Sequence, residues 1–484
     1  MWAGTAGGPG TGVTQVDAVV VGSGPNGLAA AVTLARAGLE VHVVEGATTP
    51  GGGCRTEELT LPGFRHDVCS AAHPLLALSP FFADPAFDAL RGRLVRPEVP
   101  FAHPLDDGRA AAALPSVDAT ADALGVDSRA YRRLLAPLVD EVAALAAGVL
   151  APVRRPTRHP LVLARFGAVG VRSLDHLAGR FATPEARALL AGAAGHAVRP
   201  LSAPVTAGFA LLLTAAAHAV GWPVVTGGSA AVTDALVDEL ARLGGTLEVG
   251  RWVGSLDELP RATAVLLDVA PAALPDLVGG ALPDGYRRAL GRFRPAPGVC
   301  KVDWALSGPV PWANPEIGRA ATVHLGGTVA EIAASEAEVL AGRVPARPFV
   351  IFVQATVADP SRAPAGRHTG WAYCHVPHGS TVDCTDAIEA QVERFAPGFR
   401  DTILARHTVH AAGMEAYDAN YVGGDINGGA GTLRQVFTRP AVSPRPWVTP
   451  VPHTYLCSSA TPPGGGVHGM CGWHAARAAL RRDG

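Results

Sequence analysis

The chain has 484 residues, of which 48% are apolar and 17% are charged, a composition that excludes a disordered or fibrous protein. This length exceeds what a single hydrophobic core usually supports, so we expect two domains. The 40 basic and 42 acidic residues give a net charge of -2, which provides no overall field to attract nucleic acid or an anionic membrane.

The first predicted element is a strand–turn–helix–strand unit over residues 16–45. Its strands are the apolar runs VDAVVV and LEVHVVE, and its helix has Pro25 in the first turn and Gly38 at its end. A glycine turn, GSGPNG, joins the first strand to the helix. This order of elements predicts a βαβ unit of the Rossmann type.

The glycine turn carries the spacing G-x-G-x-x-G at Gly22, Gly24 and Gly27. In a dinucleotide site the first glycine permits the tight turn, the second lets the backbone approach the diphosphate, and the third lets the helix pack on the strand. Glu45 ends the second strand, where a carboxylate binds the adenosine ribose hydroxyls. We therefore predict dinucleotide contacts at Gly22, Ser23, Gly24, Pro25, Asn26, Gly27, Glu45 and Gly46.

The middle of the chain is predicted to be helical and then to return to a βα pattern. Residues 119–220 are rich in Ala and Leu at helical spacing. The most apolar stretch, 204–222, is interrupted by Thr206, Thr214 and His218, so we expect a buried helix there and no membrane span. After it come a glycine turn, a helix predicted over 230–243 and a short strand predicted over 264–270.

The last third of the chain predicts a second sheet and a return to the first domain. Four β-prone runs separated by Pro and Gly, at 299–306, 321–325, 349–357 and 368–376, favour a mixed or antiparallel sheet. The segment HTYLCSSATPPGGGVHGMCGWHAARAAL predicts a strand, a glycine-rich loop and a helix. We expect an α/β protein with two domains. The first is a discontinuous Rossmann-type domain over residues 14–80, 222–285 and 441–484. The second is a substrate domain inserted into it, over residues 81–221 and 286–440, with a mixed sheet and a helical subregion.

Several motifs recur in the order and spacing of a known family: GSGPNG, Glu45, PGGGCRT at 50–56, GGSAAVTDAL, and PPGGGVHGMCGWHAARAA near the end. With these motifs the chain resembles the phytoene dehydrogenase-like branch of the flavin amine oxidase and carotenoid desaturase superfamily, from residue 16 to residue 480. The resemblance implies a Rossmann-type fold and FAD as the cofactor. Because no second dinucleotide fingerprint is present, we expect oxygen or a quinone, and not NAD(P)H, as the redox partner of the flavin.

The resemblance also implies cofactor contacts outside the first βαβ unit. The loop 50–56 would reach the diphosphate or the flavin edge, the segment after the mid-chain strand would clasp adenine, and the C-terminal loop would lie against the flavin pyrimidine. Many relatives carry Gly-Asp or Gly-Ala where this chain has two serines, so a serine hydroxyl is expected in their place. The contacts predicted in this way are Gly52, Gly53, Arg55, Thr56, Trp252, Val253, Ser459, Gly466, Val467, His468 and Gly469.

Three residues are candidates for a catalytic role. Lys301 is the only lysine of the chain. Its strand is similar to the amine oxidase strand in which a lysine holds a water near flavin N5. In that strand a tryptophan follows about ten residues after the lysine, and Trp312 matches this spacing to within one residue. His375 could act as an acid or base near neutral pH, and His468 lies inside the predicted flavin loop. The alternative for each is an ordinary structural role: a surface strand for Lys301 and satisfied packing for the histidines.

The expected function is an FAD-dependent dehydrogenase, desaturase or oxidase that removes hydride from a C–H bond of a lipophilic or polycyclic small molecule. A flavin amine oxidase is the alternative among enzymes. An aromatic cage beside the flavin would favour an amine oxidase, but only 6% of the residues are aromatic, which argues against it. The alternative of another class is a non-catalytic lipid- or prenyl-binding protein with the fold of the Rab GDP-dissociation inhibitors. The complete set of glycine motifs argues against that class.

The cysteine pattern and the N-terminal segment bear on the location and partners of the protein. Seven cysteines without a CxxC pair indicate reduced thiols in the cytoplasm and no metal site. Residues 1–16 are expected to form a loose tail and no signal peptide. We expect no nucleic-acid partner and no transmembrane segment; peripheral membrane contact and the oligomeric state stay open.

Overall fold

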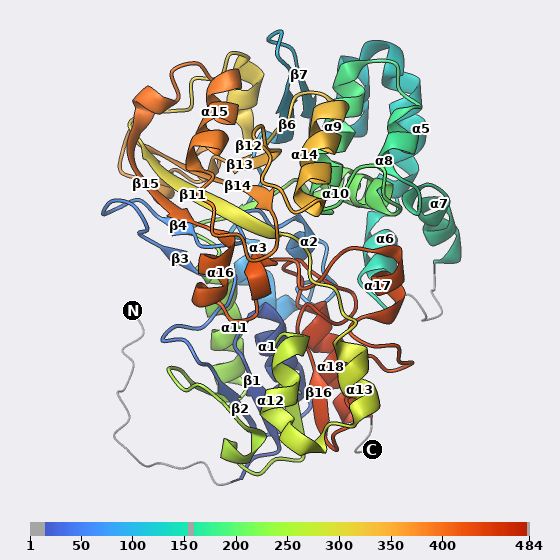
Figure 1. Cartoon of the computed structure of the whole chain (residues 1–484), viewed down its shortest axis with the longest axis vertical. Coiled ribbons are helices and arrows are strands. Elements are labelled where there is room, and N and C mark those ends of the chain that lie inside the picture. The colour runs from blue at the N-terminus through green and yellow to red at the C-terminus, as the bar shows by residue number, and fades with distance from the viewer. Residues whose placement is uncertain (1–14, 153–158, 482–484) are drawn as a thin grey trace.

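The computed structural model describes residues 15–152 and 159–481, so most of the predicted N-terminal tail lies outside the described residues. Its framework is two sheets, one in each half of the elongated molecule (Figure 1). The five-stranded sheet has the order β16-β10-β1-β2-β9, and the seven-stranded sheet has the order β15-β11-β14-β13-β12-β6-β7. The predicted α/β class with a Rossmann-like domain and a mixed sheet is confirmed.

The five-stranded sheet is parallel throughout and joins the two ends of the chain. Apart from the partly exposed edge strand Thr246–Glu248, its strands are short, mostly apolar runs buried between helices, as a parallel sheet requires. They are β1 (Ala18–Val21), β2 (Val41–Val44), β9 (Thr246–Glu248), β10 (Ala264–Leu267) and β16 (Thr454–Leu456). The helix α1 (Pro25–Arg36) packs against α11 (Ala230–Arg242) and against the C-terminal α18 (Met470–Leu480).

The contact between α1 and α18 depends on a glycine. A Cβ on Gly472 would lie 1.8 Å from the backbone oxygen of Asn26, so no other residue allows the helices to approach this closely. The first and last glycine-rich turns therefore lie on the same side of one sheet.

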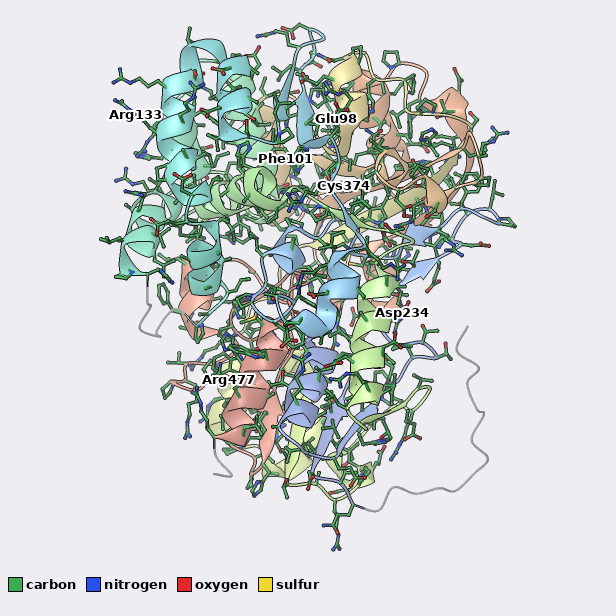
Figure 2. The ribbon with its side chains drawn as sticks, turned by 180° about the vertical axis from the view of Figure 1, so that it is seen from behind. Glu98, Phe101, Arg133, Asp234, Cys374 and Arg477 are labelled. Atoms are coloured by element: carbon green, nitrogen blue, oxygen red, sulfur yellow. The ribbon has the colours of Figure 1, made fainter. Side chains whose placement is uncertain are left out.

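The seven-stranded sheet is mixed: β6 and β12 run parallel and the other neighbours are antiparallel. Its strands are β6 (Val99–Pro104), β7 (Ala110–Ala113), β11 (Gly298–Leu306), β12 (Ala320–Leu325), β13 (Val350–Val353), β14 (His368–Val376) and β15 (Ile403–Val409). One face packs on the helices α9 (Pro184–Gly195) and α10 (Thr206–Val220), and the other packs on α15 (Thr385–Phe395). Figure 2 shows the molecule from behind, with Phe101 where the helices meet this sheet.

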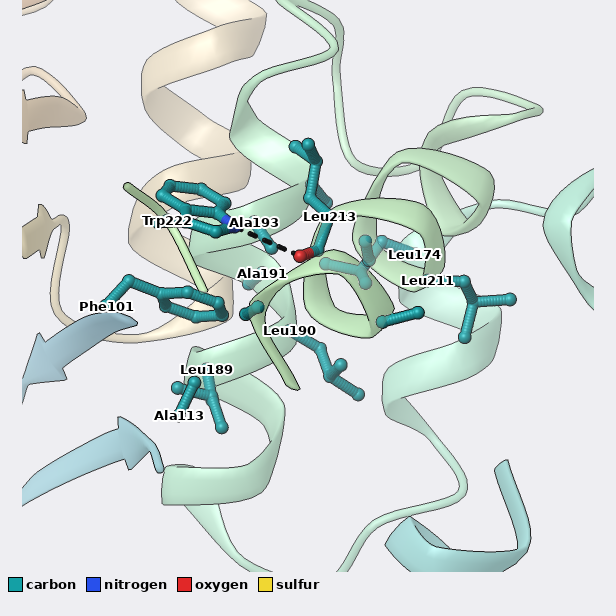
Figure 3. Close-up of a cluster of buried hydrophobic side chains, with 14 of the residues drawn as sticks. Phe101, Ala113, Leu174, Leu189, Leu190, Ala191, Ala193, Leu211, Leu213 and Trp222 are labelled. Atoms are coloured by element: carbon teal, nitrogen blue, oxygen red, sulfur yellow. Dashed lines mark hydrogen bonds between the residues drawn. The ribbon is translucent and has the colours of Figure 1, made fainter. Parts of the chain in front are cut away.

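The predicted helical region forms a layer beside this sheet. Its helices are α4 (Val117–Ala123), α5 (Ser128–Val139), α6 (Val142–Val149), α7 (Pro160–Gly170), α8 (Leu174–Ala178), α9 (Pro184–Gly195) and α10 (Thr206–Val220). Within the described ranges no helix has both the length and the apolar character to cross a bilayer. After α10, Trp222 packs on Phe101 and its Nε1–H donates to the Leu213 carbonyl at 3.1 Å (Figure 3).

The remaining elements are mostly short. They are α2 (Pro74–Ala77), α3 (Asp88–Arg91), α12 (Leu274–Val278), α13 (Asp284–Leu290), α14 (Val329–Leu340), α16 (Ala411–Tyr417), α17 (Leu433–Thr438), β3 (Thr56–Glu57), β4 (His66–Asp67), β5 (Leu94–Val95) and β8 (Val224–Val225). Phe81, Phe87 and Leu90 pack into the core around α1 and α18, so that core extends beyond residue 80.

Candidate cofactor and substrate cavity

A cavity of about 680 Å³ lies between the two sheets. Gly22 and Gly24 from the first glycine turn line it together with Gly466 and Val467 from the last one. Its wall continues to residues of the seven-stranded sheet, among them Trp371. The two distant glycine-rich segments thus enclose one space, as the predicted cofactor site requires.

The spacing of the first turn is fixed by close packing around Asp268, which follows β10. Gly22 has a φ of +95°, and a Cβ on Gly24 would lie 2.8 Å from Oδ2 of Asp268. A Cβ on Gly27 would lie 2.1 Å from the backbone oxygen of Gly22. Gly27 does not line the cavity itself; it lets α1 begin close to the turn.

Asp268 is a cavity residue that the sequence analysis missed. Its Oδ2 accepts a hydrogen bond from the Gly27 N–H at 2.8 Å, at the N-terminus of α1. Burial raises the pKa of Asp268 to about 7; the Gly27 hydrogen bond lowers it, and the charges of Asp418 and Glu45 raise it further. A titratable group therefore lies beneath the turn where a diphosphate is expected.

Glu45 is held at the cavity wall by three hydrogen bonds. Its Oε2 accepts from the Ser23 N–H at 2.8 Å and from the Ser23 hydroxyl at 2.6 Å, and its Oε1 accepts from the Ala47 N–H at 2.8 Å. Ser23 is fully buried and does not line the cavity, so its role is to orient Glu45. The lone pairs left on the carboxylate can accept from ribose hydroxyls.

The predicted adenine contacts lie next to Glu45. Trp252 packs on Gly46, where a Cβ would lie 2.8 Å from the indole, and Trp252 and Val253 both line the cavity. The Trp252 side chain is 70% exposed, which leaves one indole face available for a flat ring.

The second glycine loop contributes backbone and one arginine. Gly52, Gly53 and Arg55 line the cavity. The Arg55 guanidinium donates to the Thr49 carbonyl at 2.8 Å and lies over the ring of Tyr417 at 5.2 Å. A Cβ on Gly53 would lie 2.0 Å from the Tyr421 hydroxyl, so the 417–421 segment closes over this loop.

Thr56 does not reach the cavity. Its hydroxyl donates to Asp67 at 2.8 Å and accepts from the Ala230 N–H at 3.1 Å, which ties β3 and β4 to the start of α11. The hydroxyl thus both donates and accepts inside the protein, and a cofactor contact at Thr56 stays a prediction.

In the C-terminal loop, Ser459, Gly466 and Val467 line the cavity, whereas His468 and Gly469 do not. Nδ1 of His468 accepts from the Met470 N–H at 3.0 Å, so its Nε2 carries the proton and donates to the Gly464 carbonyl at 3.1 Å. Burial lowers the pKa of His468 to about 4. The imidazole is neutral and shapes the loop, and it is not directed at a substrate.

Lys301 and His375 stand behind the cavity wall. Lys301 is 2% exposed, pairs with Asp303 two residues along β11, and lies 5.7 Å from the ring centre of Trp371. The Nδ1 atom of His375 lies 2.7 Å from Glu336 of α14, and both side chains are 1% exposed. Neither side chain lines the cavity; Trp371 and Tyr373 of β14 line it in their place.

The wall on the side of the seven-stranded sheet is apolar and aromatic. It is formed by His196, Trp222, Thr322, Ile351, Val353, Trp371 and Tyr373. None of these described side chains is a carboxylate or a guanidinium. The sequence analysis missed this wall because its residues come from five separate segments and share no motif.

The residues of the other wall fit a dinucleotide cofactor. Glycines stand where backbone must approach a ligand, and Glu45 is oriented at the end of β2. Asn26, at the N-terminus of α1, also lines the cavity, and its side-chain oxygen has no hydrogen-bond partner among the described residues. An unpaired buried polar atom at the N-terminus of a helix is expected where a polar ligand completes the site.

Comparisons with known proteins agree with this geometry. The model of the NAD(P)-binding Rossmann-like domain matches residues 20–83. The chain is 25% identical to pyridine nucleotide-disulfide oxidoreductase domain-containing protein 2 of Mus musculus, over 96% of this chain and 94% of that protein.

Two solved structures with the same fold span nearly the whole chain. An oxidoreductase from Methanosarcina mazei is 18% identical, with a TM-score of 0.64 over 96% of this chain and 100% of that one. A cyclohexylamine oxidase from Brevibacterium oxydans is 16% identical, with a TM-score of 0.57 over 96% of this chain and 99% of that one. The chain thus has an α/β oxidoreductase fold whose N-terminal part is a Rossmann-like nucleotide-binding domain.

Proposed function

We propose that the protein is an FAD-dependent oxidoreductase of the phytoene dehydrogenase-like type, which removes hydride from a C–H bond of an apolar organic molecule. The observation that carries this proposal is the continuous cavity, in which glycine turns and Glu45 form one wall and an uncharged aromatic sheet face forms the other. A flavin dinucleotide spanning the first wall would present its reactive ring to the second.

Each part of the first wall has a distinct task in this proposal. Glu45 would bind the ribose, the first glycine turn and the N-terminus of α1 would bind the diphosphate, and the backbone at Gly466 and Val467 would lie against the pyrimidine. When bound, FAD supplies the two-electron chemistry, accepting hydride from the substrate carbon.

The second wall positions the substrate and keeps water out. Ile351, Val353 and Trp371 bury apolar surface, and Tyr373 packs perpendicular to Trp371 with ring centres 5.2 Å apart. Hydride transfer needs the substrate held over the acceptor more than it needs an acid or base. Lys301, which contacts the Trp371 ring, would act as a positioning residue for this wall.

A flavin amine oxidase is the second candidate, because the perpendicular rings of Trp371 and Tyr373 could flank an amine. The lack of a carboxylate on this wall favours a neutral substrate instead. Cyclohexanol and cyclohexylamine share a carbon skeleton and separate the two candidates.

The test is anaerobic mixing of the FAD-loaded protein with each compound while the visible flavin absorption is followed. We expect the alcohol and larger apolar ring compounds to bleach the flavin and the amine to leave it oxidised. Bleaching by the amine alone would establish the second candidate. A protein that contains no flavin and takes none up would instead support a binding protein without redox activity.

A further inference from the structure

One imidazole lies on the aromatic wall of the cavity, that of His196. It follows α9 directly, and its ring packs edge-on against Trp222 with centres 5.2 Å apart. Its Nε2 lies 2.9 Å from Nε2 of His324, a fully buried residue of β12. Since only one hydrogen can lie between two neutral imidazole nitrogens, one of these rings donates and the other accepts.

The surroundings of His324 decide which ring donates. Its Nδ1 has no hydrogen-bond partner among the described residues, and Gly192 packs on that edge so closely that a Cβ there would lie 2.7 Å from Nδ1. This leaves no room for a water, and a buried N–H without a partner is the rarest defect in folded proteins. His324 therefore carries its hydrogen on Nε2 and donates it to His196.

His196 must then carry its own hydrogen on Nδ1. The Nδ1 atom of His196 makes no hydrogen bond to a described residue, and it is not fully buried. Because His196 lines the cavity, this atom is accessible from it. Burial, aided by the nearby His375, lowers the pKa of His196 to about 3, so the ring stays neutral at physiological pH. The cavity thus presents one oriented imidazole N–H on an uncharged wall whose other polar side-chain groups include the Thr322 and Tyr373 hydroxyls.

We propose that His196 donates its Nδ1–H to an oxygen of the substrate, so the cavity selects an apolar ring compound that carries a carbonyl, hydroxyl or ether oxygen over the corresponding hydrocarbon. The inference deepens the proposed function and rests on it. An ammonium ion has no lone pair to accept this bond, so a protonated amine gains nothing from His196. Trp222, whose ring packs against His196, lines the cavity next to this N–H.

The test compares 1-tetralone with tetralin, which differ by one carbonyl oxygen, as ligands of the FAD-loaded protein. Binding is followed by quenching of tryptophan fluorescence, because Trp222 and Trp371 line the cavity. We expect the ketone to bind about ten-fold more tightly, as one buried neutral hydrogen bond allows. In His196→Phe the preference should fall to within about two-fold. In His196→Asn, whose amide N–H lies near the position of Nδ1, it should largely return.

His176→Phe, a change at an exposed position of α8, is the matched control and should keep the wild-type preference. Equal affinity of the wild type for both probes, or an unchanged preference in His196→Phe, would overturn the inference. The wild-type comparison stands even if His196→Phe does not fold. The flavin content of each sample distinguishes a failure of the proposed redox function from a failure of the His196 inference. A ketone preference in a protein without flavin would refute the redox function and leave the His196 site intact.

Discussion

Asp268 places a buried carboxylate beneath the first glycine turn, where a diphosphate is expected. Its hydrogen bond to the Gly27 N–H occupies part of the helix N-terminus that would otherwise attract the phosphates. In sequence it is only the residue after an apolar strand, and its partner lies 241 positions away. The glycine spacing and Glu45 could be predicted from a local motif, whereas this contact could not, because it depends on which strand lies next to β1.

Asp268→Asn keeps an acceptor for the Gly27 N–H and removes the charge. Because an ionised Asp268 would repel the diphosphate, we expect the wild-type affinity for FAD to fall about ten-fold per pH unit above pH 7, and that of Asp268→Asn to stay flat. FAD titrations at pH 6 and pH 8.5 measure this. Asp238→Asn on the exposed face of α11 is the control, and an equal pH dependence in all three proteins would contradict this role.

The same residue affects stability without cofactor. Since the pKa of Asp268 in the folded state, about 7, exceeds its ordinary value of 3.8, the folded protein holds this proton more tightly than the unfolded chain. Its contribution to the free energy of unfolding is therefore greatest below about pH 4 and is lost as the pH rises to 7. Urea unfolding of the apo forms at pH 5 and pH 8 should show a smaller decrease in Asp268→Asn than in the wild type.

At the scale of elements, the position of β11 could be predicted from the sequence, but the contacts of its side chains could not. Its extent and its mixed sheet were predicted, and alternate residues such as Val302 pack on α15, as the strand period requires. Its register with β14 sets Lys301 opposite Tyr373 and Asp303 opposite Trp371. The strand period places Lys301 and Asp303 on one face, but their position behind Trp371 depends on a register that joins distant segments and could not be derived from spacing.

The main effect of Lys301→Met should therefore be a loss of stability. It leaves Asp303 buried without its cation, a change that typically costs about 3–5 kcal/mol in the free energy of unfolding. The double variant Lys301→Met with Asp303→Leu should recover a large part of this loss, as urea titration can measure. A fully stable Lys301→Met protein would show that the ion pair contributes little, and the single lysine would then need another explanation.

At the scale of the whole molecule, the cavity exists because the chain returns to its starting sheet. The strand β16 pairs with β10, and α18 packs on α1 through Gly472. The glycine motifs and their family resemblance were enough to predict this closure. The aromatic wall was beyond prediction, since His196, Trp222 and Trp371 come together only when the helical layer, β12 and β14 are packed.

The measurement that tests the proposed FAD site most directly is the flavin content of the purified protein. It is obtained from the visible absorption and from the FAD released on denaturation. Our account predicts about one FAD per chain, bound on purification or taken up on addition of FAD. It also predicts a marked loss of FAD affinity in Glu45→Ala and none in Glu40→Ala, an exposed glutamate five residues earlier. A folded wild-type protein that neither contains nor binds FAD would contradict the account.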